Sequence, residues 1–165
     1  MTVPTRHEGT LDGTGLRVAI VQGRFNWLIG EKLTQGAIET LTTNGVADDA
    51  IDVYIVPGAF ELPAMVKRLS DQDRFDVILA IGVVIRGGTP HFEYVCSEAA
   101  RGVADVAFHS KAAIAFGVLT CDDMQQALDR AGEGAGDSDH GNKGDEAARA
   151  ALEMANLYRT LDRGN

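Results

Sequence analysis

Four short apolar runs constrain the fold of this chain most, because each ends at a turn and a segment with helical spacing follows each. The runs are apolar throughout rather than at alternate positions, which is typical of parallel strands buried on both faces. They cover residues 17–21, 52–56, 77–85 and 113–119, and the helical segments cover residues 27–43, 60–69, 90–108, 122–131 and 145–161. This alternation predicts an α/β fold, a three-layer α/β/α sandwich with a central four-stranded parallel sheet.

The 165 residues, 45% of them hydrophobic, are enough for one domain with a sizeable core. Residues 1–15 are polar with scattered glycine and have no apolar periodicity, so we expect an N-terminal arm or edge strand before a domain over 16–165. Residues 132–144 are rich in glycine and acidic side chains and predict the one long internal loop.

Charge and cysteine content exclude several classes of protein. Asp and Glu total 24 against 15 Lys and Arg, a net charge of -9, which argues against a nucleic-acid partner. The longest apolar run, residues 77–85, is far below the roughly 20 residues of a membrane helix, and no signal peptide opens the chain. We therefore expect a cytoplasmic protein without a membrane partner.

No pattern of metal ligands stands out either. Cys96 and Cys121 form no CxxC pair, so a structural zinc site or a disulfide framework is not expected. Asp137, Asp139 and His140 lack the glycine and glutamate that complete a calcium loop, so a solvated acidic stretch is the better interpretation.

Ligands of parallel sheets bind beyond the carboxyl ends of the strands, which directs attention to four turns. The turn after the third strand contains Gly87 and Gly88, then Thr89 as a helix N-cap and Pro90 in the first turn. Exposed amides at a helix N-terminus suit an anion, although a tight turn with a good cap explains this motif equally well. His91 favours the anion site, because the helix N-terminus disfavours a charged imidazole and leaves it able to exchange protons.

The turns after the second and first strands suggest a site for a flat ring with hydroxyl groups. Gly58 and Ala59 expose backbone amides, and Glu61 is an acceptor for sugar or polyol hydroxyls, or else a first-turn carboxylate that satisfies the helix dipole. Phe25 and Trp27 follow the first strand and form a candidate stacking platform. The alternative is a hydrophobic staple at the helix entrance, which one of the two aromatics would serve.

Arg130 and Lys143, two cationic residues in the C-terminal third of the chain, each have two possible interpretations. Arg130 near the end of a short helix is by itself a common dipole-compensating residue. Lys143 lies in a Gly-Asn-Lys-Gly context that would either fold over a ligand or remain solvated.

Six segments taken together resemble the 6,7-dimethyl-8-ribityllumazine synthase family, from about residue 16 to residue 161. They are Gly-Arg-Phe-Asn at 23–26, Val-Pro-Gly-Ala-Phe-Glu-Leu-Pro at 56–63, Val-Ile-Arg-Gly-Gly-Thr-Pro-His-Phe-Glu-Tyr-Val at 84–95, Phe-Gly-Val-Leu-Thr at 116–120, Gln-Ala-Leu-Asp-Arg-Ala-Gly at 126–132 and Asn-Lys-Gly-Asp-Glu-Ala-Ala at 142–148. The resemblance implies a flavodoxin-like fold and a transferase of riboflavin biosynthesis. Such an enzyme condenses 5-amino-6-ribitylaminouracil with 3,4-dihydroxy-2-butanone 4-phosphate, releases phosphate and water, and uses neither metal nor redox cofactor.

The resemblance also implies roles for individual residues. His91 would carry protons, and Phe25 would stack on the pyrimidine. The other implied substrate-binding residues are Ala59, Phe60 and Glu61 along the ribityl chain, the backbone around Val84 and Ile85 at the ring edge, Gly88, Thr89 and Arg130 at the phosphate, and Gly58, Arg86, Phe116 and Lys143. Phe116, Arg130 and Lys143 would come from the neighbouring subunit, so each site is shared within a homopentamer. Glu146 would orient or pair groups at the site.

One departure from the family is a longer, acidic link over residues 133–141, which bears on the reach of Lys143. Some family members pack pentamers into capsids, and this link predicts a free pentamer or at most a decamer instead. A non-catalytic lumazine or flavin carrier is the alternative function, but a carrier needs neither His91 nor Arg130. An electron carrier of the flavodoxin type fits less well, because residues 22–25 lack its hydroxyl-rich phosphate loop.

Overall fold

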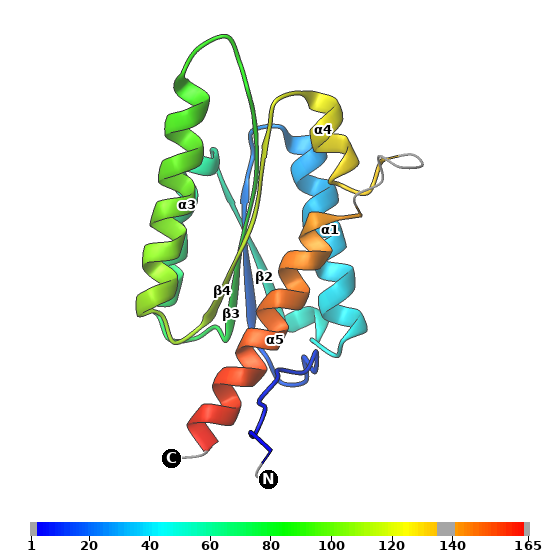
Figure 1. Ribbon diagram of the computed structural model, residues 1–165, viewed down its shortest axis with the longest axis vertical. Coiled ribbons are helices and arrows are strands. Elements are labelled where there is room, and N and C mark those ends of the chain that lie inside the picture. Colours follow the sequence, from blue (N-terminus) through cyan, green and yellow to red (C-terminus); the bar gives the residue numbers. More distant parts are fainter. Residues whose placement is uncertain (1–2, 135–140, 164–165) are drawn as a thin grey trace.

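The computed structural model describes residues 3–134 and 141–163. Within these residues four parallel strands form one sheet in the order β2-β1-β3-β4, and helices cover both of its faces (Figure 1). The strands are β1 (Val18–Gly23), β2 (Ile51–Val56), β3 (Val77–Ile85) and β4 (Ala113–Cys121), and the α-helices are α1 (Trp27–Thr43), α2 (Leu62–Ser70), α3 (His91–His109), α4 (Met124–Asp129) and α5 (Lys143–Arg163). The predicted three-layer α/β/α sandwich is confirmed.

The apolar runs are continuous because the sheet has a core on each face. In β1, Val18 and Ile20 point into the core beneath α1 and α5, whereas Ala19 and Val21 point into the core beneath α2 and α3. Successive residues of a strand face opposite ways, so burial on both faces requires every position to be apolar. The same alternation continues along the central strand β3.

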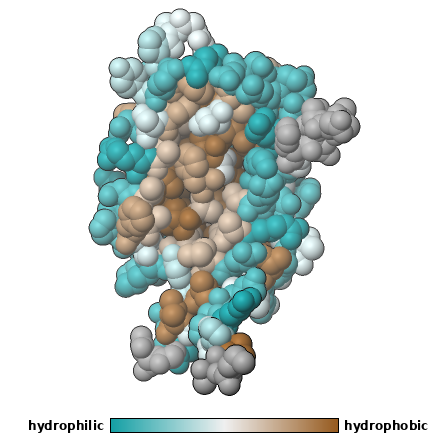
Figure 2. Space-filling view, in the orientation of Figure 1, coloured by the Kyte–Doolittle hydropathy of each residue, from teal (hydrophilic) through white to brown (hydrophobic). Residues whose placement is uncertain are grey.

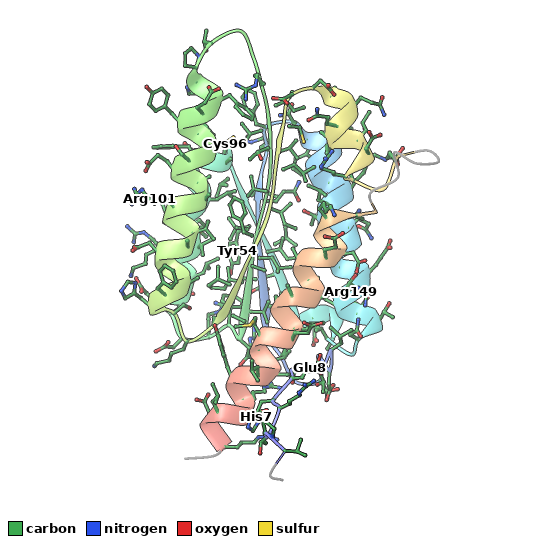
Figure 3. All side chains as sticks on the ribbon, viewed as in Figure 1. His7, Glu8, Tyr54, Cys96, Arg101 and Arg149 are labelled. Carbon is green, nitrogen blue, oxygen red and sulfur yellow. The ribbon has the colours of Figure 1, made fainter. Side chains whose placement is uncertain are left out.

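The helix layer formed by α2 and α3 separates an inner face from a solvent face (Figure 3). Cys96 on α3 lies toward the sheet, and Arg101 on the same helix points away from it. Tyr54 of β2 lies between the layers, with its ring edge-on to Phe75 at 6.3 Å between centroids. The carboxyl ends of the strands stay uncovered between the two helix layers.

Most helix boundaries agree with the sequence, and the start of α3 is the clearest exception. Helix α1 covers the predicted residues 27–43, and Asn44 and Gly45 end it, with Gly45 at φ +98°. Helix α3 begins at His91 with Pro90 as its N-cap, and no side chain caps it, so the prediction of Thr89 as N-cap is wrong. Pro90 already has right-handed φ and ψ, and the Glu93 amide donates to its carbonyl oxygen at 3.1 Å, so the first turn closes on Pro90 rather than on Thr89.

The other helix starts also shift. A 3₁₀ turn over Ala59–Glu61 precedes α2, so the segment predicted as one helix from residue 60 is two elements. Helix α4 is shorter than predicted, because Asp123 caps it by accepting a hydrogen bond from the Gln126 amide at 2.8 Å. Helix α5 begins two residues early, at Lys143.

The described part of the N-terminal arm, residues 3–15, forms no strand and lies along the C-terminal half of α5. Asn156 of α5 donates hydrogen bonds to the carbonyl oxygens of Thr10 and Asp12, both at 2.9 Å. His7 and Glu8 lie beside the same end of α5 in Figure 3. Among the described residues, no helix combines the length and the apolar character that crossing a membrane requires.

Candidate active site

A cavity of about 670 Å³ opens at the carboxyl ends of β1, β2 and β3. The chain runs from β1 outward to β2 and then crosses to β3 on the other side of β1, so the strand order reverses at this point. Crevices at such reversals are where open α/β sheets bind ligands. Its described lining consists of Phe25, Asn26, Pro57, Gly58, Ala59, Phe60, Glu61, Val83, Val84, Ile85, Gly87, Thr89, His91, Phe92, Tyr94 and Val95.

The turn after β1 brings Phe25 to this cavity. The Phe25 amide donates a hydrogen bond to the Pro57 carbonyl at 3.1 Å, so the turn stays attached to the end of β2. Asn26 adopts the left-handed conformation at φ 56°, which asparagine tolerates better than most residues, and its Nδ2 donates to the Val83 carbonyl at 3.0 Å. The ring of Phe25 is left 75% exposed, an available face for a flat ligand. Trp27 lies outside the described lining.

The turn after β2 supplies a polar edge to the cavity. Residues Gly58, Ala59, Phe60 and Glu61 all line it, with Ala59 buried and Phe60 exposed. The Glu61 amide donates to the Gly58 carbonyl at 3.2 Å, which closes the 3₁₀ turn. The Glu61 carboxylate is therefore available to accept hydrogen bonds from hydroxyl groups in the cavity.

The turn after β3 adds the N-terminus of α3. Thr89 and His91 line the cavity, and a Cβ atom added at Gly87 or Gly88 would meet nothing within 4 Å. Packing within the chain does not demand glycine at these positions, so backbone amides there are open to approach. Together with the free amides of the α3 N-terminus, this geometry suits an anion beside the His91 imidazole.

Arg86 holds this turn rather than lining the cavity. Its Nε donates to Asp122 at 2.8 Å, its Nη1 to Glu93, and its guanidinium carbon lies 4.3 Å from the centre of the Phe92 ring. The hydrogen bonds that Arg86 donates to Asp122 and Glu93 raise the pKa of Arg86, and the one to Glu93 lowers the pKa of that carboxyl. These hydrogen bonds use two of the five N–H groups of Arg86, and Arg86 does not belong to the described lining of the first cavity.

Phe116, Arg130 and Lys143 line a second cavity, of about 580 Å³, between the edge strand β4 and helix α5. The Lys143 Nζ pairs with Glu146 at 2.6 Å, and the Arg130 Nη1 donates to the Gln126 carbonyl at 3.1 Å. None of the three cavity-lining side chains belongs to the described lining of the first cavity. Within one chain, the predicted site residues thus divide into two groups.

Six lining residues to which sequence analysis assigned no role are Asn26, Pro57, Val83, Phe92, Tyr94 and Val95. The latter three lie in the first turns of α3, where an approximate helix phase could have indicated which side chains face the cavity. Asn26 had a weaker signal: an asparagine between a strand and a helix is a candidate for the left-handed conformation.

The described residues contain no cluster of three or more His, Cys, Asp or Glu side chains arranged to hold a metal ion. Burial raises the pKa of both Cys96 and Cys121, so neither thiol is activated as a nucleophile. The titratable side chains in the described lining of the first cavity are those of Glu61, His91 and Tyr94.

Comparison with known proteins agrees with this geometry. The model of the family described as 6,7-dimethyl-8-ribityllumazine synthase matches residues 15–159. The chain belongs to the 6,7-dimethyl-8-ribityllumazine synthase family. A 6,7-dimethyl-8-ribityllumazine synthase of Anaeromyxobacter dehalogenans (strain 2CP-C) is 54% identical over 157 residues, covering 95% of this chain and 94% of the relative. Those of Anaeromyxobacter sp. strain K and strain Fw109-5 are each 52% identical, covering 95% and 93% of this chain and 94% and 91% of the relatives. Membership in this lumazine synthase family thus extends over nearly the whole chain.

Proposed function

We propose that this chain condenses 5-amino-6-ribitylaminouracil with 3,4-dihydroxy-2-butanone 4-phosphate to 6,7-dimethyl-8-ribityllumazine, releasing phosphate and water. The observation that carries the proposal is the convergence of Phe25, Glu61 and His91 on one cavity in a chain of this family. These side chains provide an aromatic surface, a polyol acceptor and a proton carrier, which are the groups that a ribityl-bearing ring and its reaction need.

Each group has a defined part in the proposed reaction. Phe25 stacks on the pyrimidine, and the backbone of Val84 and Ile85 binds the ring edge. Ala59, Phe60 and Glu61 hold the ribityl chain, with Gly58 beside them. The pyrimidine amine attacks the ketone, and the His91 imidazole accepts and donates protons as the carbinolamine loses water and phosphate is eliminated.

The phosphate site completes the proposal. Gly88 and Thr89 present the open backbone near the α3 N-terminus, and Arg130 and Lys143 supply positive charge to the same anion. Holding both substrates together supplies part of the acceleration through proximity alone. Arg86 fixes the turn that carries Gly88 and Thr89 through its hydrogen bonds to Asp122 and Glu93, and its other N–H groups can bind the substrate.

We further propose that each site is shared by neighbouring subunits of a homopentamer. Phe116, Arg130 and Lys143 line a cavity separate from the first, which supports a role for them in the first cavity of a neighbour rather than of their own chain. The contact joins two different surfaces, and such heterologous contacts close into a ring when the rotation between subunits permits. The number five rests on the family resemblance.

The surface over β4 supports this assembly. Strand β4 is an edge of the sheet, and Figure 2 shows apolar side chains gathered in the middle of this face, between the α3 side and the α5 side. Phe116 on β4 is 41% exposed and Met154 on α5 is equally exposed. An exposed apolar edge strand is a surface that proteins usually cover.

The test is to incubate the purified protein with both substrates and to follow the fluorescent lumazine and the released phosphate. Formation of both products supports the enzyme, whereas tight lumazine binding without turnover would support a carrier and overturn the proposal. The proposal includes a cytoplasmic location, where the free thiols of Cys96 and Cys121 would stay reduced.

A further inference from the structure

Arg130 and Lys143, two residues that line the second cavity, meet at a backbone junction that has no role in the proposed chemistry. Arg130 follows α4, and Lys143 begins α5, with the acidic link 133–141 between them in the chain. Ala131 and Asn142 nevertheless pair as an antiparallel bridge, and the Lys143 amide donates to the Arg130 carbonyl at 2.9 Å. The two cationic residues are thus fixed next to each other at the base of the link.

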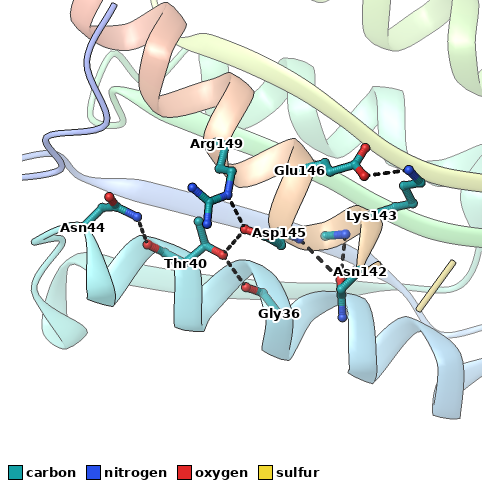
Figure 4. A network of polar contacts seen from close by, with 9 residues as sticks. Gly36, Thr40, Asn44, Asn142, Lys143, Asp145, Glu146 and Arg149 are labelled. Carbon is teal, nitrogen blue, oxygen red and sulfur yellow. Dashed lines mark hydrogen bonds and ion pairs between the residues drawn. The ribbon is translucent and has the colours of Figure 1, made fainter. Parts of the chain in front are cut away.

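The Asn142 side chain connects this junction to the rest of the fold (Figure 4). Its Nδ2 donates to the Ala131 carbonyl at 3.2 Å and to the Lys32 carbonyl of α1 at 2.9 Å. Its Oδ1 accepts from the Gly144 amide at 2.8 Å and from the Asp145 amide at 3.4 Å, which caps α5. One amide group therefore links the start of α5, the end of the α4 segment and helix α1.

Two glycines make room for this side chain. A Cβ atom at Gly36 of α1 would lie 2.5 Å from the Asn142 Cγ, and a Cβ atom at Gly144 would lie 1.9 Å from the Leu33 carbonyl oxygen. Any larger residue at either position would displace the amide or separate the helices. The Asn142 side chain is therefore held in a fitted site and not merely placed on a surface.

We propose that Asn142 is the positioning residue for Arg130 and Lys143, and that its hydrogen bonds keep this pair in place whatever the length of the link 133–141. This inference rests on the proposed function, in which the pair binds the substrate phosphate. It explains how a chain with a lengthened link retains the phosphate site. The Ala131–Asn142 bridge joins the two ends of the link, so the length of the link does not change the positions of Arg130 and Lys143.

The test uses the whole protein with steady-state kinetics for both substrates. Asn142→Ala raises the apparent KM for the butanone phosphate about 10-fold or more, because a small displacement of a binding group is costly, and changes that for the pyrimidine less than about twofold. Asn142→Asp keeps the acceptor that caps α5 but turns an oxygen toward the Lys32 and Ala131 carbonyls. It therefore gives the same selective KM rise with a retained helix cap.

Gly36→Ala supplies an independent variant. It leaves Asn142 unchanged but occupies the space of its amide, and alanine is otherwise the better helix former. The same selective rise in KM is expected. If both substrates' KM values rise together, or if neither changes in any of the three variants, Asn142 does not position the cations and the inference is wrong.

Asn156→Asp is the matched control, since Asn156 lies on the same helix and its amide also donates to backbone carbonyls, those of Thr10, Asp12 and Leu152. Asn156→Asp should lower the thermal midpoint about as much as Asn142→Asp does, and it should leave both KM values unchanged. If this control also raised the KM for the butanone phosphate selectively, the Asn142 effect would come from a general loosening of α5, and the inference would be wrong.

Binding of inorganic phosphate, measured by calorimetry on the same proteins, separates the two proposals. A wild-type protein that binds phosphate but makes no lumazine contradicts the proposed function, and weaker phosphate binding in the Asn142 variants would then still support the positioning role. Equal phosphate binding by wild type and variants contradicts the positioning role even if the wild type is active.

Discussion

At the scale of single residues, the candidate site contains few groups that can move a proton or hold an anion. His91 stands at the N-terminus of α3 on the cavity wall, and Glu61 lines the opposite turn after β2. Arg130 and Lys143 are the cations of the second cavity. These positions give each residue a different expected effect when it is replaced.

Replacing His91 tests the proton carrier. His91→Ala should lower turnover by roughly 10- to 1000-fold with little loss of pyrimidine binding, because acid–base assistance is lost while proximity survives. Steady-state turnover and a separate binding titration with the pyrimidine check this. Unchanged turnover would remove His91 from the mechanism.

Replacing Arg130 tests the phosphate contact. Arg130→Ala should raise the apparent KM for the butanone phosphate far more than that for the pyrimidine, and Arg130→Lys should restore it only in part, because the planar fork of donors is lost. The measurement is the KM for each substrate at saturation with the other. Equal effects on the two values would contradict the assignment.

At the scale of elements, the turn between β3 and α3 depends on the charged contact between Arg86 and Glu93. Because the pKa of Glu93 is lowered in the folded protein, this contact stabilises the fold above the ordinary carboxyl range and is lost as pH falls through the lowered pKa. Glu93→Gln should therefore lower the thermal midpoint at neutral pH, and the difference from wild type should vanish in strong acid. Thermal unfolding across pH measures it.

The matched control is Glu98→Gln on the same helix, since Glu98 pairs with Arg101 at 2.6 Å and its pKa is also lowered by that partner. Both variants should lose the same kind of pH-dependent stability. Only Glu93→Gln should also lower turnover, because only its contact holds the turn that carries Gly88 and Thr89. Equal turnover in the two variants would show that the contact between Arg86 and Glu93 does not affect the site.

Much of this element-level structure could be predicted, because the local signals are strong. Continuous apolar runs predict the buried strands, and Asn44-Gly45 predicts the end of α1. The starts of α3 and α5 could not be predicted as well, because they depend on the φ and ψ of Pro90 and on the contacts of Asn142 with distant carbonyls. The separation of Phe116, Arg130 and Lys143 from the other site residues was implied by the family resemblance and not by any local pattern, because it follows from the position of β4 at a sheet edge.

At the scale of the whole molecule, the proposed site is complete only where two different surfaces of neighbouring chains meet. The acidic link over residues 133–141 bears on whether the proposed rings pack against one another. Glu133 pairs with Lys32 of α1 at 2.6 Å, while Asp137 and Asp139, also part of the predicted acidic contact, lie outside the described residues. Like charges brought together between rings repel, and a long link opposes close packing.

We therefore expect a free pentamer, or at most a decamer, in solution at moderate salt. Light scattering or analytical ultracentrifugation gives the mass directly. A particle of capsid mass would contradict this expectation, and a monomer active at low concentration would contradict the shared site.

The central claim, a condensing site built from two neighbouring chains, is tested most directly by mixing two impaired variants. His91→Ala and Arg130→Ala, coexpressed in equal amounts, form rings in which about one quarter of the contacts join an intact first cavity to an intact neighbour. With the butanone phosphate held well below its KM for Arg130→Ala, lumazine formation should rise to about a quarter of the wild-type rate, above that of either variant alone. A mixed protein no more active than the average of the two separate variants would contradict the claim.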